Sequence, residues 1–238
     1  MSGHSKWHSI KHKKAITDAK KANIFTKLAK DISIAARDGA DPEMNFRLRM
    51  AIDKAKASNM PKDNIERAIE KGSGSSKEGI QIDELVYEAY GPGQIALLIK
   101  VATDNRNRTL GEIKNLLQKN GGKFAEGGSV MWQFEQVGSL LAIPKKELNK
   151  EDIEIKIIES NALDYSEEDD RYSIFTQPQE LQKVKDALSS FFDLEEVDLI
   201  FRAKNKIKID GKAQAAYERL LEALDEQEDV SAVYDNLE

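Results

Sequence analysis

Apolar residues in the first 72 positions recur at intervals of three and four, the spacing of amphipathic helices. We predict helices over residues 17–39, 43–58 and 61–72, and the second begins with Asp41 as N-cap and Pro42 in its first turn. These three helices form a small helical domain. Its predicted buried stripe consists of Ile24, Phe25, Leu28, Ala29, Ile32, Ala35, Ala36, Leu48, Ile52, Ala55, Ile65, Ala68 and Ile69.

The pattern changes after residues 72–79, "GSGSSKEG", which have the composition of a flexible linker. β-Branched and aromatic residues dominate "LVYEAYG" (85–91) and "IALLIKVAT" (95–103), so two strands joined by a "GPG" turn are predicted. The sequence "TLGE" (109–112) is a capping-box pattern and predicts the start of a helix that continues to Gly121. A further strand is predicted over "SVMWQFE" (129–135).

The following segment alternates in a regular order, strand–helix–strand and then strand–helix–strand again, which is typical of a ferredoxin-like fold. The predicted elements are strand 139–143, helix 150–161, strands 163–166 and 171–176, helix 179–192 and strand 197–202. A last helix over 212–224 and a strand over 230–234 are too small for a domain. We therefore expect them to complete the sheet that begins near residue 82.

The predicted fold class is α+β multidomain. An N-terminal helical bundle with a basic arm occupies residues 1–75. A discontinuous α+β domain occupies residues 80–135 and 205–238. A ferredoxin-like domain, residues 136–204, is inserted in it.

Composition excludes several classes of protein. Hydrophobic residues make up 40% and charged residues 33% of the 238 residues, which is typical of a soluble globular chain. No apolar run approaches the ~20 residues of a membrane span, and no apolar stretch follows the basic N-terminus as in a secretory signal. The chain has no cysteine, so we expect a reducing compartment, the cytoplasm.

Charge is distributed unevenly along the chain. Residues 1–72 hold 16 basic and 9 acidic residues, a net charge of +7, and the remainder holds 20 basic and 33 acidic, a net charge of −13. The first 30 residues contain eight lysines and one acid, Asp18. A chain of this polarity can bind a polyanion at one end. The alternative is that the lysines only solubilise a helical surface.

The basic arm "GHSKWHSIKHKK" (3–14) combines lysines with aromatic side chains and holds no acid. Lysines suit phosphates, and binding should then weaken steeply as salt rises. Trp7 has two interpretations: it packs on the helical domain as an anchor, or it stacks on an unpaired base. Only Trp7 and Ile10 are large apolar residues in the arm, too few for a membrane-surface helix.

His4, His8 and His12 are spaced four apart and would share one helical face, on which three imidazoles could bind zinc. No carboxylate lies near enough in sequence to orient such ligands. We therefore expect no metal and treat these histidines as additional donors to phosphates.

A second polar run, "TDNRNRT" (103–109), precedes a predicted helix, whose N-terminal N–H groups favour anions. Arg106 and Arg108 are therefore candidate phosphate contacts. The alternative is a loop whose arginines satisfy neighbouring acids.

The sequence gives no sign of catalysis or of a cofactor. The glycines of "GGKFAEGGS" (121–129) match neither a P-loop nor a dinucleotide fingerprint. A histidine-based triad would have to use the arm itself. We expect a protein that is not an enzyme.

Several motifs together are similar to those of the YebC family. They are "GHSKW", "IKHKK", "NFRLRMAIDKAKASNMPKDNIERAIEKG", "YEAYGPG", "TDNRNRT" and "GGSVMWQFE". The resemblance covers residues 3 to about 135 with specific motifs and continues more loosely to "EDVSAVYDNLE". It implies three domains, with a ferredoxin-like domain inserted in an α+β domain.

The resemblance also implies a non-enzymatic role in gene expression. Members of the family are described as DNA-binding transcription regulators. Others act as translation factors on the ribosome, at ribosomal RNA near the peptidyl-transferase region, where they help peptide-bond formation at difficult sequences. The absence of a recognisable groove-reading motif favours structured RNA, and the family name favours transcription.

The leading hypothesis is a nucleic-acid-binding regulator, a DNA-binding transcriptional regulatory protein. The alternatives are a ribosome-associated translation factor and, third, an acidic protein-interaction module. We expect a monomer that has no membrane partner. The predicted nucleic-acid contacts are Lys6, Trp7, His8, Lys11, His12, Lys13, Lys14, Lys20, Lys21, Lys27, Arg106 and Arg108.

Overall fold

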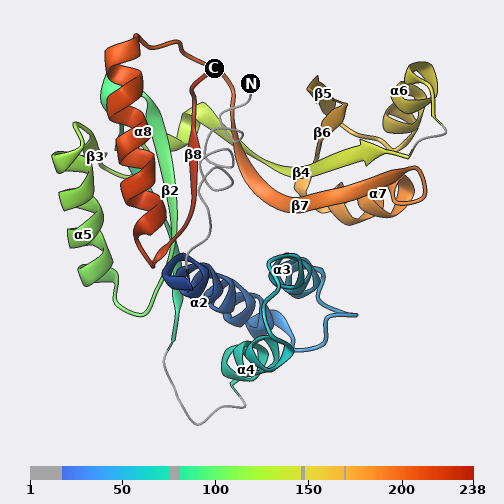
Figure 1. Ribbon diagram of the computed structural model, residues 1–238, viewed down its shortest axis with the longest axis horizontal. Helices are drawn as coiled ribbons and strands as arrows, with labels where there is room; N and C mark the ends of the chain where they lie inside the picture. Colours follow the sequence, from blue (N-terminus) through green and yellow to red (C-terminus); the bar gives the residue numbers. More distant parts are fainter. Residues whose placement is uncertain (1–17, 75–80, 146–147, 169) are drawn as a thin grey trace. The chain divides into compact units, whose positions relative to one another are not determined.

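The structure is a computed structural model that describes residues 18–74, 81–145, 148–168 and 170–238. The chain divides into two compact units (Figure 1). Unit 1 comprises residues 1–134 and 203–238, and unit 2 comprises residues 135–202. The helical region and the first sheet thus share unit 1, and the division into three domains stays a prediction.

The helical part of unit 1 contains α2 (Asp18–Ala35), a short 3-10 turn (Ala36–Asp38), α3 (Phe46–Ala57) and α4 (Lys62–Gly72). α2 packs against both of the other helices. Their shared core is apolar and matches the predicted stripe, with Ile32, Leu48 and Ala55 fully buried.

The predicted start of the second helix was wrong by three residues. Asn45, not Asp41, is the N-cap of α3, because its side-chain oxygen accepts the N–H of Leu48 at 3.0 Å. The same amide donates to the carbonyls of Ala35 and Gly39, each at 2.7 Å. Asn45 thus caps α3 and also binds the end of α2, and a carboxylate could not do both, since it cannot donate a hydrogen bond.

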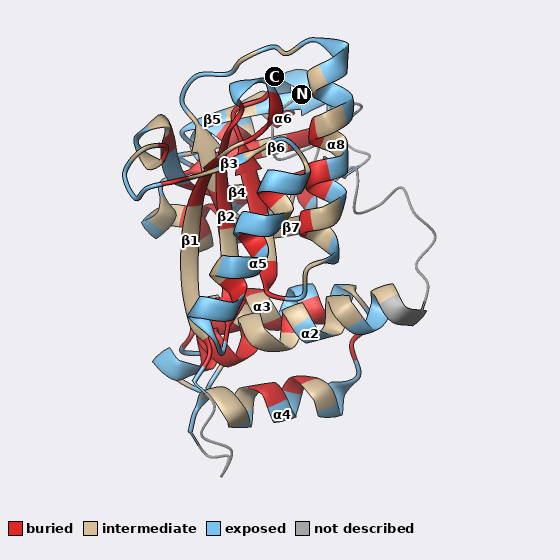
Figure 2. Ribbon diagram, turned by 90° about the vertical axis from the view of Figure 1, so that its left-hand side faces the viewer, coloured by how far each residue is buried: buried red, intermediate tan, exposed pale blue. Residues whose placement is uncertain are grey.

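The sheet of unit 1 has the order β3-β1-β2-β8. Its strands are β1 (Asp83–Tyr90), β2 (Ala96–Thr103), β3 (Lys123–Ala125) and β8 (Val230–Asp235), and each neighbouring pair is antiparallel. Helices α5 (Arg106–Lys119) and α8 (Gly211–Glu226) pack together and enclose the larger core of unit 1 with this sheet. Figure 2 shows the buried strands behind these two helices. The C-terminal helix and strand complete the sheet begun at β1, as predicted.

Helix α5 begins three residues before the predicted capping box. Its N-cap is Asn105, whose side chain accepts the N–H of Arg108 at 3.1 Å. Thr109 lies inside the helix and is buried, and its hydroxyl contacts Thr103 and the carboxylate of Asp229. The predicted capping box was therefore wrong, because Thr109 is used in tertiary packing.

The strand predicted over residues 129–135 was also wrong. Residues Met131–Gln133 form a 3-10 turn and β4 begins at Phe134. The buried carboxylate of Glu88 accepts the backbone N–H groups of Gly128, Val130 and Met131 at 2.6, 2.5 and 2.8 Å. These N–H groups therefore cannot join a strand ladder, and Glu88 fixes the loop instead.

Unit 2 has the ferredoxin-like succession predicted from sequence. Its elements are β4 (Phe134–Pro144), α6 (Lys150–Glu159), β5 (Asp164–Glu168), β6 (Arg171–Thr176), α7 (Leu181–Leu188) and β7 (Phe192–Ala203). The sheet order is β5-β6-β4-β7, so the first and third strands of the unit lie in the centre. The two strand–helix–strand halves therefore interleave, as this fold requires.

Unit 2 is joined to unit 1 by two neighbouring chain segments. The backbone N–H of Lys204 donates to the carbonyl of Gln133 at 2.9 Å. The chain thus leaves and re-enters unit 1 at adjacent points, which is the geometry of an inserted domain.

Candidate nucleic-acid interface

All of the predicted contacts in the basic arm lie outside the described residues. They are Lys6, Trp7, His8, Lys11, His12, Lys13 and Lys14. The remaining five predicted contacts fall within the described part of the chain. Two of these lie on α2 near its start, one lies further along that helix, and two lie at the start of α5.

Lys20 and Lys21 occupy the first turns of α2, directly after the basic arm in sequence. Lys21 is exposed, and its ammonium group lies 5.7 Å from the ring centroid of Phe25, within cation–π range. Lys20 is half-buried. These two lysines are available to extend the charge of the arm along α2.

Lys27 is engaged within the protein. Its ammonium group donates to the carbonyl of Asp225 at 2.5 Å and lies 3.9 Å from the carboxylate of the same residue. Asp225 lies near the end of α8, so Lys27 fastens α2 to that helix. Binding of nucleic acid by Lys27 stays a prediction.

Arg106 and Arg108 also bind carboxylates of this chain. Arg106 Nε lies 2.7 Å from a carboxylate oxygen of Asp83. Arg108 contacts Asp104 at 3.0 Å and Asp229 at 2.8 Å. These contacts support the alternative in which the "TDNRNRT" loop satisfies neighbouring acids, and a phosphate role for either arginine stays a prediction.

Asp229 is a buried carboxylate on which three side chains, from α2 and α5, converge. It receives hydrogen bonds from Lys30 of α2, from Arg108 at 2.8 Å and from Thr109 at 2.6 Å. Burial alone would raise the pKa of Asp229, but the bonds from Lys30, Thr109 and Arg108 outweigh it and lower the pKa to about 2. The carboxylate is therefore charged at neutral pH and holds α2 to the part of unit 1 that contains the sheet.

Sequence reasoning missed two surface features. Trp132, predicted to lie in a strand, is 65% exposed, and its indole N–H donates to the carbonyl of Ser129 at 3.0 Å. A groove between α2 and α4 contains Lys30, Arg67 and Lys71. No local motif marks this groove, because its two walls come from helices that lie far apart in the sequence; Ser33 and Ala68, which share a hydrogen bond between them, are 35 positions apart.

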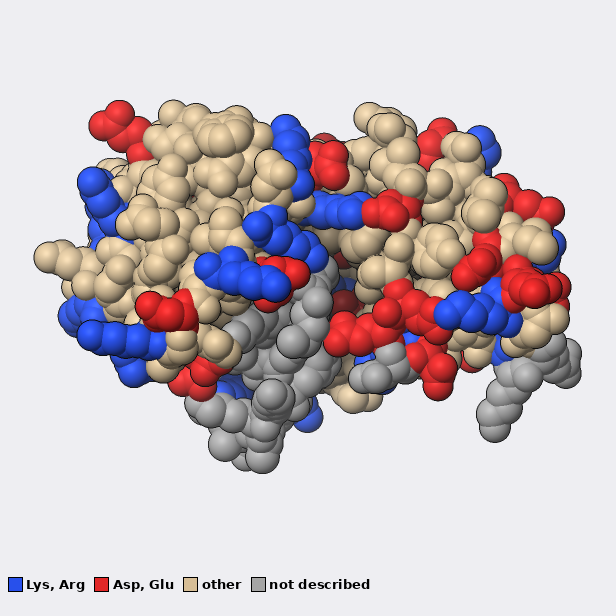
Figure 3. Space-filling view, turned by 90° about the horizontal axis from the view of Figure 1, so that it is seen from above, with Lys and Arg blue, Asp and Glu red and all other residues tan. Residues whose placement is uncertain are grey.

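The two units differ in charge. Unit 2 holds 8 basic and 17 acidic residues, a net charge of −9. Figure 3 shows acidic side chains gathered over unit 2 and more numerous Lys and Arg side chains over the described part of unit 1. A polyanion is therefore repelled more strongly by unit 2 than by unit 1.

The described residues hold neither a metal-binding cluster nor a membrane-spanning helix. No group of three or more His, Asp or Glu side chains suited to a metal ion occurs among the described residues. Within the same residues, no helix combines the length and apolarity needed to cross a bilayer.

Two family models match nearly the whole chain. Residues 5–75 match the TACO1/YebC protein N-terminal domain, and residues 82–237 match the TACO1/YebC second and third domain. The chain belongs to the TACO1/YebC family. The resemblance seen in the motifs is thereby confirmed, and the match extends through the ferredoxin-like segment.

Relatives in this family share about two-fifths of their residues with the chain. A "probable transcriptional regulatory protein" of Thermoanaerobacter pseudethanolicus is 42% identical over 240 residues, covering 100% of this chain and 97% of its own. A protein of the same name from Chloroflexus aggregans is 44% identical over 242 residues, covering 100% and 96%.

A solved structure confirms the fold class. The crystal structure of a conserved hypothetical protein from Aquifex aeolicus is 40% identical and superposes with a TM-score of 0.85. The match covers 96% of this chain and 95% of that chain. The mixed helical and antiparallel-sheet architecture is thus shared with an experimental structure of a relative.

Proposed function

We propose that this protein is a nucleic-acid-binding regulator of gene expression, a DNA-binding transcriptional regulatory protein of the TACO1/YebC family. It acts as a monomer in the cytoplasm, needs no cofactor and catalyses no reaction. The basic arm and the first turns of α2 bind phosphates, and the acidic unit 2 remains away from the polyanion.

The observation that carries this proposal is the polarity of charge. Eight lysines lie within residues 1–30, and unit 2 has a net charge of −9. Lys20 and Lys21 extend the arm's charge onto an ordered helix. Lysines that neutralise phosphates release counterions, and this supplies affinity that does not depend on base sequence.

Removal of the arm tests the proposal. A chain lacking residues 2–14 should lose binding to duplex DNA measured by fluorescence anisotropy at several salt concentrations. Full-length protein should show an affinity that falls linearly on a logarithmic salt scale. Retained affinity with an unchanged salt slope in the shortened chain would contradict the proposal. Circular dichroism confirms that the shortened chain remains folded.

The alternative candidate is a ribosome-associated translation factor that binds ribosomal RNA near the peptidyl-transferase region. The character of α4 favours it. The exposed side of this helix mixes Lys62 and Arg67 with acids, namely Asp63, Glu66 and Glu70. Such a face is poorly suited to the major groove of DNA, and recognition by shape and backbone fits structured RNA.

Sedimentation of a cell lysate through a sucrose gradient separates the two candidates. Co-migration with the large ribosomal subunit, abolished by removal of residues 2–14, would support the translation factor. Migration in the light fractions, together with DNA fragments recovered by crosslinking and precipitation, would support the transcriptional regulator.

A further inference from the structure

The groove between α2 and α4 lies on the helical part of unit 1, next to the proposed phosphate-binding region. Its volume is about 400 Å³, within the range of small-ligand sites. The residues that form its walls recur at three and four along each helix. They are Phe25, Thr26, Ala29, Lys30 and Ser33 on α2, and Asn64, Arg67, Ala68 and Lys71 on α4.

One end of the groove is closed by close approach of the two helices. The hydroxyl of Ser33 donates to the carbonyl of Ala68 at 2.8 Å. Gly72 packs so closely that a Cβ there would lie 2.1 Å from the carbonyl oxygen of Ser33. The groove is therefore walled by two closely packed helices, and Met60, Ile82 and Asp104 from the neighbouring connecting segments complete its lining.

The surface of the groove is predominantly apolar. Phe25 and Ala29 from α2 face Met60, Ala68 and Ile82. Met60 and Ile82 are buried, whereas Phe25 is only half-buried and so presents part of its ring to the groove. A flat aromatic group can pack in such a space.

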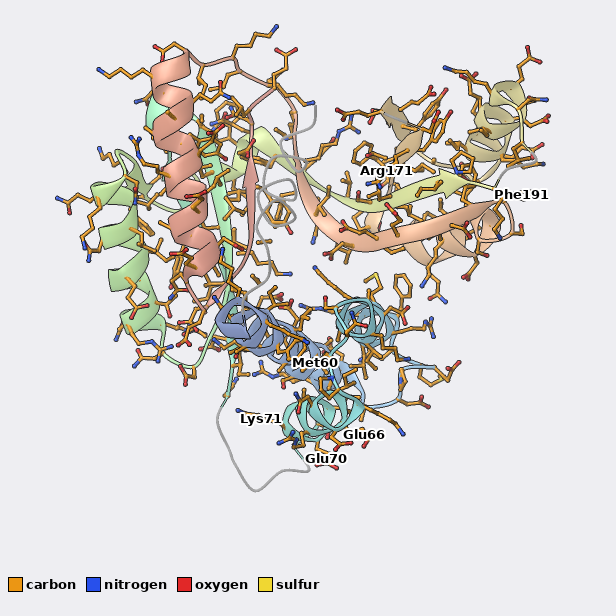
Figure 4. The ribbon with its side chains drawn as sticks, in the orientation of Figure 1. Met60, Glu66, Glu70, Lys71, Arg171 and Phe191 are labelled. Atoms are coloured by element: carbon orange, nitrogen blue, oxygen red, sulfur yellow. The ribbon has the colours of Figure 1, made fainter. Side chains whose placement is uncertain are left out.

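The charge at the rim is positive. Lys71 makes no hydrogen bond or ion pair within the described part of the chain. Among the described residues, the guanidinium of Arg67 donates to the carbonyl of Asp63 and to the side chain of Asn64, so it keeps further donors for a ligand. The acid in the lining, Asp104, is paired with Arg108, and Lys30 is paired with Asp229. Figure 4 shows Lys71, with Met60 nearer α2, whereas Glu66 and Glu70 lie along the outer side of α4.

Taken together, the geometry points to a binding site for one unpaired nucleotide of a nucleic-acid strand. The base packs against Phe25 and Met60, and the phosphate binds Lys71 and Arg67. The positive rim favours an occupant of negative charge. The lysine-rich arm of this chain is therefore disfavoured as the occupant. The groove begins one turn after Lys21, so a strand bound at Lys21 can continue into it. This inference rests on the proposed nucleic-acid-binding function and adds a preference for unpaired segments.

The test compares single-stranded with duplex binding in the full-length protein. The probes are a fluorescein-labelled RNA of ~12 nucleotides and its blunt duplex. Ala29→Phe fills the groove without changing the charge, and Lys71→Ala removes the unpaired cation. Lys62→Ala is the matched control, because Lys62 lies on the same helix, is 86% exposed and does not line the groove.

Ala29→Phe should weaken single-strand binding about tenfold, equivalent to ~1.4 kcal/mol, and leave duplex binding nearly unchanged. Lys71→Ala should weaken single-strand binding more than Lys62→Ala does. With 4-thiouridine in the strand, photocrosslinks should map to peptides containing Phe25 or Met60. Because Lys71→Ala is a surface change, it remains informative even if Ala29→Phe impairs folding.

Three results would overturn the inference. Single-strand binding unchanged in both groove variants would mean that the groove takes a protein segment or no ligand. If Lys71→Ala and Lys62→Ala lower the affinity by the same factor, for the single strand and the duplex alike, then these cations act only through general electrostatic attraction. Displacement of the labelled strand by micromolar AMP would assign the site to a free nucleotide. In each case, loss of all binding on removal of residues 2–14 would leave the proposed function intact.

Discussion

The ammonium group of Lys30 and the carboxylate of Asp229 form an ion pair in which the acid is completely buried. Lys30 belongs to α2, whereas Asp229 directly precedes β8. Arg108 and Thr109, at the start of α5, bind the other oxygen of the same carboxylate. One acid thus joins the helical part of unit 1 to the part that contains its sheet.

Asp229→Asn should destabilise the protein near neutral pH by about 2 kcal/mol, because the pKa of Asp229 is lowered from 3.8 to about 2. A depressed pKa contributes stability that is present above the unfolded value and lost as pH falls through the folded value. The difference in the free energy of unfolding between wild type and variant should therefore narrow as pH falls from 3.8 towards about 2. Urea unfolding at several pH values measures it.

Asp225→Asn is the control for this pH dependence. Asp225 pairs with Lys27 at 3.9 Å and is partly exposed, so Asp225→Asn should lower the free energy of unfolding much less than Asp229→Asn does. A difference between wild type and Asp229→Asn that stays constant across the acidic range would contradict the assignment.

Glu88→Ala should release the loop before β4. Burial would raise the pKa of Glu88, but the N–H groups of Gly128, Val130 and Met131 outweigh it and lower the pKa. Removal of this carboxylate leaves three N–H donors without their acceptor, at a cost of about 3 kcal/mol. Hydrogen exchange of these three amides should accelerate. Glu126→Ala, an exposed change in the same loop, should leave their protection intact, and equal exchange in both variants would refute the prediction.

Lys21→Ala and Lys27→Ala should separate binding from stability. Lys21 is exposed and contacts an aromatic ring, so its loss should reduce the salt slope of nucleic-acid binding by about one and leave stability nearly unchanged. Lys27 is held by Asp225, so its loss should lower the unfolding midpoint. Anisotropy and urea unfolding on both variants test this. Reversed outcomes would show that Lys27 is the phosphate contact.

Gly72→Ala should destabilise the helical part of unit 1. The added Cβ would meet the backbone of Ser33 at 2.1 Å, and such overpacking costs about 1–3 kcal/mol. Gly111→Ala is the matched control, since no atom lies within 4 Å of its added Cβ and it also lies in a helix. It should stabilise by about 0.5–1 kcal/mol. Thermal unfolding of the two variants should therefore shift in opposite directions.

Periodicity predicted most elements because their burial is one-sided. The α2 stripe containing Ile32 and the ferredoxin-like order of unit 2 both follow from local spacing of apolar residues. Errors occurred where a polar residue serves a distant partner. Asn45 binds the end of α2, Thr109 contacts Asp229, and Glu88 binds the loop at residues 128–131.

The candidate site was less predictable than the fold. Sequence identifies a basic arm but cannot show that Lys27 is held by Asp225 or that Arg108 is held by Asp229. The partners of these cations lie far away along the chain. The groove walled by Phe25 and Lys71 likewise exists only after α2 and α4 pack together.

The position of β8 has a consequence for synthesis of the protein. β8 pairs with β2, yet Lys100 and Ser231, which share a hydrogen bond across this pairing, are 131 residues apart. At about 5–20 residues per second, roughly 7–26 s pass after the synthesis of β2 before β8 can pair with it. During that interval all of unit 2 emerges and can fold. The edge of β2 that later pairs with β8 has no partner strand, and the carboxylate of Asp229 is not yet present to bind Lys30. The nascent chain is then at its most vulnerable to misassociation, and arrival of Asp229 and β8 ends that period.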